Sequence, residues 1–209
     1  MARPSRNPPV LDWLATRCSL DLSQPSPIRL TGLRREDLAW WFDEWGFTRG
    51  AEIGVYQALF TRVLVHANPR LHLLAVDPYE VYPEYTDMLA SRMPNLPQVY
   101  ERVKALVADW PVTLVRQRSA DAAKDVPLNS LDFVYIDGNH AKDYVLEDLA
   151  LWTDRVRPGG VIAGHDYHKF PKPPYSHIKV MRAVNHWVRR RHIAPWFLLD
   201  CDSYFWVKA

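Results

Sequence analysis

The sequence predicts an α/β fold, in which a doubly wound and mainly parallel β-sheet is closed by a C-terminal antiparallel β-hairpin. Two strand–helix–strand units carry this prediction, one running from Arg49 to Asp77 and the other from Leu131 to Tyr167. Short apolar runs that alternate with amphipathic helices are typical of a parallel sheet covered by helices on both faces. Two further apolar runs, Trp196–Leu199 and Tyr204–Val207, flank the turn residues Asp200–Ser203 and predict the hairpin, which we place at the sheet edge.

The chain has 209 residues, which is enough for one sizeable core, and we expect a single domain over residues 1–209. Residues 1–9 are basic and rich in proline, and we expect a mobile tail there. Residues 10–47 are expected to form a helical N-terminal segment, and residues 48–209 the α/β core.

The composition is that of a globular protein, with 48% apolar and 24% charged residues. The net charge of +2 gives no strong attraction to nucleic acid or to an anionic membrane. No stretch has the length and apolarity of a membrane span, and no signal-like segment opens the sequence. Cys18 and Cys201 are too few for a disulfide framework and form no CxxC pair. These features favour a cytoplasmic protein.

The N-terminal segment is expected to hold two helices. The first lies within Leu11–Leu22 and is followed by a proline-containing connector, Ser23–Ile28. The second runs from Leu33 to Trp45, with Thr31 as its cap and Gly46 as its end. Packing against the sheet is a simpler explanation of its aromatic face than a ligand cage. That face consists of Leu38, Trp41, Phe42 and Trp45.

Residues Arg49–Asp77 predict a nucleotide-binding unit. A short strand through Ala51 and Ile53 leads into Gly54, where backbone can approach a ligand closely, and then into a helix with exposed N–H donors at its start. The next strand, Leu71–Val76, ends in Asp77. An acid at that place can accept both hydroxyls of a ribose.

The turn itself indicates which nucleotide is bound. A dinucleotide fingerprint requires GxGxxG, but Tyr56 and Ala58 occupy the later glycine positions. Glu52, two residues before Gly54, can hold the amino group of a zwitterionic ligand. This combination suits an amino-acid-bearing nucleoside such as S-adenosylmethionine.

Two loops are expected to border the bound ligand. Pro78–Thr86 is acidic and aromatic, so that Tyr79, Tyr82 and Tyr85 can touch a substrate, although surface tyrosines are the simpler reading. His168–Pro174 is expected to form an irregular lid.

Beyond the first loop the pattern predicts a helix over Gln98–Trp110 and a strand over Val112–Val115. The following residues, 116–121, place Ser119 or Asp121 where either can meet an adenine edge. Near the end of the chain Ile178–Arg191 predicts a helix, whose terminal arginines suit the helix dipole better than nucleic-acid binding.

The second strand–helix–strand unit carries most of the expected chemistry. Its first strand, Leu131–Ile136, ends in Asp137-Gly138-Asn139-His140, and its last, Val161–Ala163, ends in Gly164-His165-Asp166-Tyr167. Ligands of open parallel sheets sit beyond the carboxyl ends of the strands, so Asp137, His140, His165 and Asp166 should share one rim. The helix between the strands is predicted from the apolar positions Val145, Leu149, Trp152 and Val156, with Glu147, Asp148 and Asp154 largely off that face and with Pro158-Gly159-Gly160 as its stop.

Four short stretches of the chain resemble class I S-adenosylmethionine-dependent methyltransferases. The likeness is to a small bacterial family (methyltransferase-24-like) with EIGV, VDPY, YIDGxH and PGGxxAGHDY motifs. The matching residues are Glu52–Val55, Val76–Tyr79, Tyr135–His140 and Pro158–Tyr167. The resemblance covers about residues 51–209 and implies a Rossmann-like seven-stranded sheet. Ala58 departs from the pattern, because the family usually has glycine there.

The resemblance also implies roles for individual residues. Glu52, Gly54 and Val55 would lie at the methionine end of S-adenosylmethionine, and Asp77 would hold its ribose. Ser119 would border the adenine. Asp137 would lie where cofactor and acceptor meet.

Two accounts of proton removal from an acceptor hydroxyl remain open. Asp137, His165 and Asp166 can hold a divalent cation, Mg²⁺ or Mn²⁺, which would orient the hydroxyl and lower its pKa. His165 departs from the acid that metal-dependent relatives carry there. Without a metal, His140 can act as general base. In a purely structural reading, Asp137 caps the following helix and His165 hydrogen-bonds a loop.

The function expected from these observations is O-methylation of a small molecule, such as a sugar, a polyketide or a phenol. A NAD(P)-dependent oxidoreductase would share Asp77, but the missing glycines argue against it. A non-catalytic cofactor-binding partner protein is the alternative of another class. A nucleic-acid methyltransferase lacks support, since no NPPY motif is present. Aromatic residues near Trp40 and Trp45 make a homodimer conceivable.

Overall fold

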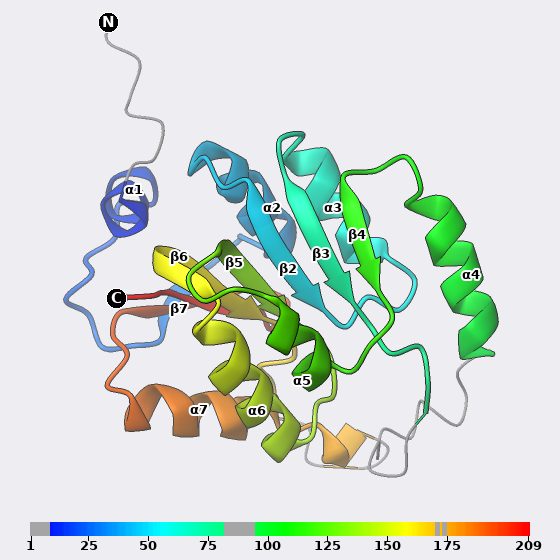
Figure 1. Cartoon of the computed structure of the whole chain (residues 1–209). Helices are drawn as coiled ribbons and strands as arrows, with labels where there is room; N and C mark the ends of the chain where they lie inside the picture. Colours follow the sequence, from blue (N-terminus) through cyan, green and yellow to red (C-terminus); the bar gives the residue numbers. More distant parts are fainter. Residues whose placement is uncertain (1–8, 82–94, 170–171, 173–174) are drawn as a thin grey trace, which may run out of the picture.

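The computed structural model describes residues 9–81, 95–169, 172 and 175–209. In this part of the chain eight strands form one sheet in the order β1-β7-β8-β6-β5-β2-β3-β4 (Figure 1). Neighbouring strands are parallel except where β8 pairs with β6 and β7. The predicted α/β class with a C-terminal antiparallel hairpin is therefore confirmed. The strands are β1 Ile28–Leu30, β2 Arg49–Ile53, β3 His72–Val76, β4 Val112–Val115, β5 Leu131–Ile136, β6 Val156–Gly164, β7 Trp196–Leu199 and β8 Tyr204–Val207.

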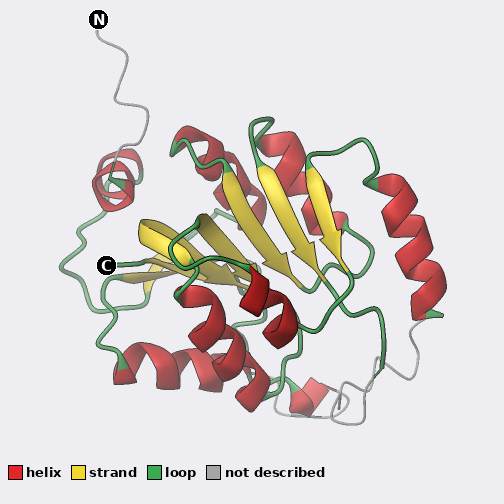
Figure 2. Cartoon of the chain, viewed as in Figure 1, coloured by secondary structure: helices red, strands yellow, loops and turns green. Residues whose placement is uncertain are grey.

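Helices cover both faces of the sheet (Figure 2). Buried side chains of α1, α2 and α3 pack on one face, and α4 covers the β3–β4 end with its own small cluster. Buried side chains of α6 and α7 pack on the other face. The helices are α1 Val10–Arg17, α2 Arg35–Glu44, α3 Leu59–Ala67, α4 Leu96–Leu106, α5 Ser119–Ala122, α6 Lys142–Thr153 and α7 Val180–Arg190, with short 3₁₀ turns η2 Ala123–Asp125 and η3 Tyr175–His177.

The strand β1 is an addition to the seven strands that the sequence predicts. It begins at Ile28, the last residue of the expected connector, and pairs in parallel with β7. The C-terminal hairpin therefore lies inside the sheet and not at its edge, which corrects that prediction. Just after β1, the Asp200 carboxylate accepts a hydrogen bond from the Gly32 amide at 2.7 Å, and the Asp200 amide donates to the Leu33 carbonyl at 2.8 Å. These bonds fix the stretch that leads into α2.

The start of α2 differs from the prediction that Thr31 caps it. The helix begins at Arg35, and the carboxylate of Asp37 accepts a hydrogen bond from the amide of Arg34 at 2.7 Å. An acid in the first turn thus satisfies a backbone donor that the predicted cap cannot reach. The apolar face of α2 packs as predicted, with Trp45 fully buried, while Trp40 is 56% exposed. Of the two tryptophans considered for a dimer contact, Trp40 alone is at the surface.

The helix α6 is shorter than predicted, because it ends at Thr153 and Val156 already belongs to β6. Pro158-Gly159-Gly160 therefore does not stop the helix. These residues lie within β6, where its register against β5 shifts between Leu131 and Phe133.

The order of the strands sets the place of the ligand site. β2 and β5 are neighbours, with β3 and β4 beyond β2 and with β6 beyond β5. The chain adds β3 and β4 on one side of β2 and then β5 and β6 on the other, and crevices at such switch points are where open α/β sheets bind ligands. Within the described ranges, no helix combines the length and the apolarity needed to cross a membrane.

Candidate active site

A cavity of about 730 Å³ opens beyond the carboxyl ends of β2, β3 and β5. Its walls come from the first turn of α2, the β2–α3 turn, the residues after β3, the start of α5 and the β5–α6 segment. The volume lies within the roughly 300–1,000 Å³ typical of cofactor and small-molecule sites. Residues of both predicted strand–helix–strand units line this one cavity.

The β2–α3 turn depends on Gly54 for a reason beyond ligand approach. Gly54 has a φ of +90°, and a β-carbon there would overlap the backbone carbonyl of Asp137. The absence of a side chain thus lets the loops after β2 and β5 cross closely. Ala58, at the end of the same turn, also adopts a left-handed conformation, with a φ of +58°, and is buried. An alanine in that region is strained by roughly 1–2 kcal/mol.

Asp77 holds the β2–α3 turn through its carboxylate. Oδ2 accepts hydrogen bonds from the amides of Val55 at 3.0 Å and Tyr56 at 2.9 Å, and Oδ1 accepts one from Tyr79 at 2.8 Å. Burial raises the pKa of Asp77, and these three hydrogen bonds oppose that rise. Asp77 lines the cavity as predicted, and its role toward a ribose stays a prediction. Glu80, which the sequence analysis missed, also lines the cavity.

Tyr79 does not reach into the cavity as a substrate contact. Its side chain is 1% exposed and packs against Tyr100 of α4. The alternation of side chains after β3 turns it into the small core under that helix. Tyr82 and Tyr85 lie outside the described residues, as do residues 1–8 of the predicted tail and residues 170, 171, 173 and 174 of the predicted lid.

Glu52 is buried on the side of β2 that faces α3. It is 2% exposed and accepts a hydrogen bond from the Thr61 hydroxyl at 2.5 Å. Burial raises the pKa of Glu52 to about 8, and the negative charge of Asp137 adds to this, while the Thr61 hydrogen bond opposes it. A carboxyl with this pKa is mostly protonated at neutral pH.

The opposite end of the cavity holds a second buried acid, Asp148 of α6. The Ser119 hydroxyl donates a hydrogen bond to Asp148 Oδ1 and accepts one from Trp152 Nε1 at 2.8 Å. Burial raises the pKa of Asp148 to about 7, against the effect of the Ser119 hydrogen bond. The sequence analysis placed Asp148 largely off the packed face of its helix, which is wrong, because the side chain is 4% exposed. Its spacing of three from Val145 would have revealed it.

Ser119 lines the cavity at the start of α5, and its role toward an adenine stays a prediction. Asp121, the other residue considered for an adenine edge, also borders the cavity. Its side chain is largely exposed and forms an ion pair with Lys124 at 2.6 Å.

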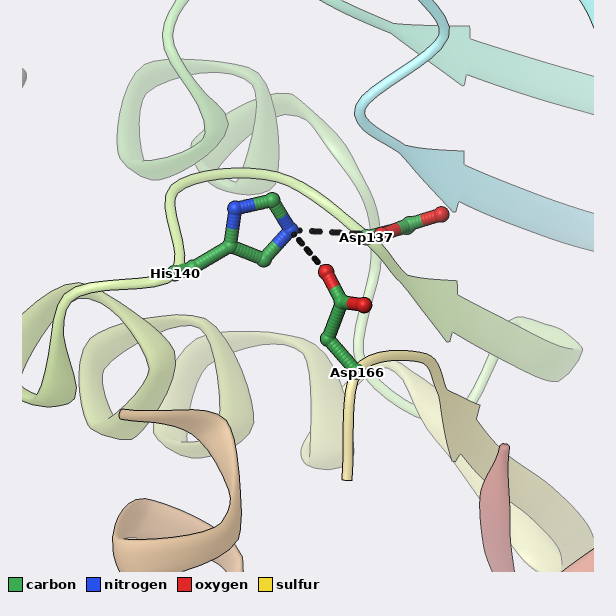
Figure 3. Close-up of side chains that lie close together, drawn as sticks. All are labelled: Asp137, His140 and Asp166. Carbon is green, nitrogen blue, oxygen red and sulfur yellow. Dashed lines mark hydrogen bonds and ion pairs between the residues drawn. The ribbon is translucent and has the colours of Figure 1, made fainter. Parts of the chain in front are cut away.

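Asp137, His140 and Asp166 come together after β5 and β6 (Figure 3), and of these Asp137 and His140 line the cavity while Asp166 lies beside them outside its lining. Their nearest ligand atoms all lie within 4.8 Å of one another. His140 Nε2 lies 2.9 Å from Asp166 Oδ2 and 3.4 Å from Asp137 Oδ1. His165 stands outside this group, with Nδ1 3.3 Å from the other oxygen of Asp166. The four predicted rim residues are thus close together, but His140 replaces His165 beside the two carboxylates.

The charges on this rim are strongly coupled. Burial opposes ionisation of Asp166, yet hydrogen bonds from His140 and His165 hold the pKa of Asp166 well below its usual range. Burial likewise lowers the pKa of His165, but the hydrogen bond to Asp166 and the charge of Asp137 outweigh it, so that the net pKa is raised. Asp166 has a φ of +60°, a left-handed conformation that aims its carboxylate at both imidazoles. Such strain is concentrated at functional sites.

The donor set at the rim fits a divalent cation. Two carboxylates and an imidazole supply oxygen and nitrogen ligands, a mixture that Mn²⁺ and later metals accept and that Mg²⁺ accepts less readily. Neighbouring ligands of an octahedral ion with bonds of about 2.1 Å are about 3 Å apart. The separations of 2.9 and 3.4 Å between the donors are of that size.

Arg35 completes the wall near Asp137 and was missed in the sequence analysis. Its Nη1 lies 3.5 Å from Asp137 Oδ2, and its guanidinium lies over the Phe60 ring at 4.8 Å from the centroid. A helical pattern alone does not reveal that the first turn of α2 faces the cavity. The hydrogen bonds of Asp200 to Gly32 and Leu33 fix the stretch before α2 and so direct the first turn of that helix toward the cavity.

Known proteins were compared with the chain. A sequence family described as a methyltransferase domain matches residues 51–167, which is more than half of the chain. No curated protein sequence shows a significant match.

Solved structures match the fold. A candidate caffeoyl-CoA O-methyltransferase from Staphylococcus aureus is 13% identical with a TM-score of 0.63, over 96% of this chain and 91% of that chain. The O-methyltransferase NovP is 16% identical with a TM-score of 0.63, over 84% and 79%. A candidate O-methyltransferase from Klebsiella pneumoniae is 18% identical with a TM-score of 0.59, over 97% and 91%. At these identities the likeness is one of fold. The family match decides the identity: this chain belongs to that methyltransferase family and is an S-adenosylmethionine-dependent methyltransferase.

Proposed function

We propose that this methyltransferase acts on a hydroxyl oxygen of a small molecule, with a divalent cation held by Asp137, His140 and Asp166. The observation that carries the proposal is the convergence of these three side chains at one end of the cavity. The O-methyltransferases among the structures with the same fold support the choice of oxygen as the acceptor atom.

The cofactor fits along the cavity in one direction. In this placement Ser119 and Asp148 would border the adenine, Asp77 and Glu80 would lie beside the ribose, and Glu52 would face the methionine; all five residues line the cavity. The reacting methyl group then lies near Asp137, at the rim. Bound there, S-adenosylmethionine supplies a methyl carbon that is electrophilic because it is attached to a sulfonium.

The rim residues would prepare the acceptor. A cation between Asp137, His140 and Asp166 would lower the pKa of a coordinated hydroxyl and orient its oxygen. As the oxygen–methyl bond forms, the sulfur–methyl bond breaks and its electron pair stays on sulfur. In this mechanism the coordinated hydroxyl would lose its proton to solvent water, because the cation lowers its pKa.

A second candidate mechanism needs no metal, and one contact favours it. His140 Nε2 lies 2.9 Å from Asp166 Oδ2, so that the carboxylate would orient the imidazole and stabilise its charged form. In this mechanism His140 takes the hydroxyl proton itself. Both mechanisms use the same residues, but only the first requires a divalent cation.

Calorimetric titration with Mn²⁺ tests the metal site directly. We expect one Mn²⁺ to bind the wild-type protein, with binding lost in Asp166→Asn, because a cation held by three residues loses a charged ligand. Asp121→Asn removes the same charge from the exposed side of the cavity and should leave Mn²⁺ binding intact. Equal binding in all three proteins would contradict the site.

Methyl transfer to a panel of sugars, phenols and polyketides, with and without a chelator, tests the reaction. Product that disappears with the chelator supports the metal mechanism. Product that persists with the chelator and disappears in His140→Gln supports the base mechanism. Transfer to amines or thiols in preference to hydroxyls would overturn O-methylation.

A further inference from the structure

We propose that Arg35 binds the α-carboxylate of the cofactor, opposite Glu52, which faces the α-ammonium group. This inference rests on the placement of S-adenosylmethionine proposed above, but not on the acceptor or the metal. It assigns a binding role to the N-terminal segment, which lies ahead of the matched family region.

The first argument is position. Arg35 is the first residue of α2, and its side chain lines the cavity together with Glu52 and Phe60. The side chain is 27% exposed, so it is partly desolvated but open to a ligand. The bonds of Asp200 to residues 32 and 33 hold the chain just before it. The cation is therefore held at this wall by the fold.

The second argument is the state of the guanidinium. Its ion pairs with Glu36 and Asp137 measure 3.7 and 3.5 Å. Charge-assisted hydrogen bonds are typically about 2.7–2.9 Å long. Packing on the Phe60 ring fixes the plane of the group without using its N–H donors. The buried hydroxyl of Tyr135 also hydrogen-bonds the guanidinium, which anchors one side of the group. A planar fork that is anchored in this way, and whose ion pairs are longer than hydrogen bonds, suits a carboxylate.

The third argument is charge complementarity. The amino-acid end of the cofactor is a zwitterion, so a site for it needs a cation and an acid side by side. Arg35 and Glu52 supply this pair on one wall, and they are close enough for the Arg35 charge to lower the pKa of Glu52. An incoming ammonium group would favour the ionised form of Glu52 further. Both ends of the zwitterion would then be paired.

Two other roles for Arg35 predict different results. An arginine that binds an anionic acceptor would leave cofactor affinity unchanged. An arginine that only positions Asp137 would affect all cofactor analogues alike.

The deciding experiment measures the dissociation constants of S-adenosylmethionine and of its decarboxylated form by calorimetry, without metal or acceptor. For the wild-type protein we expect the decarboxylated compound to bind about 10- to 100-fold more weakly, the effect of one charged hydrogen-bonded pair. In Arg35→Gln the two compounds should bind almost equally, and Arg35→Lys should keep part of the preference. Arg34→Gln, an exposed neighbour with the same charge change, should keep the wild-type ratio.

The outcomes separate the two levels of the argument. If neither compound binds the wild-type protein, the placement of the cofactor is wrong. If both bind and the ratio is the same in the wild-type protein and Arg35→Gln, the cofactor placement stands and the role of Arg35 is wrong. An equal loss of affinity for both compounds in Arg35→Gln would also overturn that role. The decarboxylated compound has no carboxylate, so the loss of a carboxylate contact cannot weaken its binding.

Discussion

Two groups of acids border the same cavity and hold their protons in opposite ways. At the rim, Asp166 is bonded to two imidazoles, which keep its pKa well below the usual range. In the lining of the cavity, Glu52 and Asp148 each accept a hydrogen bond from a hydroxyl group, and burial raises their pKa values to about 8 and about 7. All three side chains are carboxylic acids, so their surroundings decide which of them is ionised.

This contrast explains how one cavity can serve two tasks. Permanently ionised carboxylates suit a cation or an orienting contact to a base. Neutral carboxyl groups can both donate and accept hydrogen bonds, which suits the polar edges of a nucleoside and the entry of an ammonium group. Perturbed pKa values of both signs within one cavity are characteristic of active sites.

The largest expected effect comes from neutralising the ionised group. Asp166→Asn removes the charge that orients His140 and raises the pKa of His165, whichever of the two mechanisms applies. We expect turnover to fall by about 10²- to 10⁴-fold in single-turnover assays with an accepted hydroxyl compound. Affinity for S-adenosylhomocysteine should change little, because Asp166 lies beyond the residues that line the cofactor cavity. Unchanged turnover would show that the rim does not take part in chemistry.

An intermediate effect is expected from Glu52 and Asp148, whose raised pKa values affect the stability of the ligand-free protein. The folded-state pKa values of Glu52 and Asp148 lie above their unfolded values of 4.5 and 3.8, so the folded state binds more protons between about pH 4 and pH 8. Stability should therefore be highest at the acidic end of this window and should decrease as pH rises through it. Asp166, with a lowered pKa, contributes stability that is lost only at more acidic pH.

Glu52→Gln and Asp148→Asn should each flatten that decrease. Near pH 8.5 each variant should melt several degrees above the wild-type protein, while near pH 4 the difference should vanish. Melting temperatures from pH 4 to pH 9 provide the measurement. Asp121→Asn, with an exposed carboxylate, should follow the wild-type curve. A wild-type melting temperature that rises steadily across the window would contradict the neutral state of these two acids.

The smallest effect concerns Ala58 in the β2–α3 turn, which follows Glu52. Ala58→Gly should relieve its left-handed conformation and stabilise the protein by about 1 kcal/mol, or roughly 2–4 °C in melting temperature. Ala150 lies exposed in the helix α6, where glycine is unfavourable, so Ala150→Gly should instead destabilise by about 1 kcal/mol. Shifts of the same sign in the two variants would argue against strain at Ala58.

The strands of the fold could be predicted closely from the sequence, because each is a short apolar run between turn residues. The predicted bounds of Val112–Val115, Leu131–Ile136 and both hairpin strands agree with the structure. The strand β1 escaped prediction, since three residues close to prolines carry little local signal. Its partner, β7, is far away in the sequence.

The site could be predicted where side chains follow strand ends, as with Asp77, Asp137 and Asp166. It could not be predicted where helices supply the wall. Asp148 looked like a solvated charge beside an apolar stripe, and Arg35 looked like an ordinary first-turn residue. Which of the two imidazoles lies beside both carboxylates depends on the three-dimensional course of the loops after β5 and β6, including a left-handed residue at Asp166, and no residue pattern encodes that course.

The pairing of β1 with β7 has a consequence for how the protein is made. The segment that carries Arg35 is synthesised well before the strand and the turn that hold it in place, since Gly32 and its partner Asp200 are 168 residues apart. The central strands can assemble before β7 is made, whereas the cationic wall of the cavity can be fixed only after β7 and Asp200 have left the ribosome. A nascent chain stalled near residue 195 should therefore resist proteolysis across β2–β6 yet remain cleavable between α1 and α2.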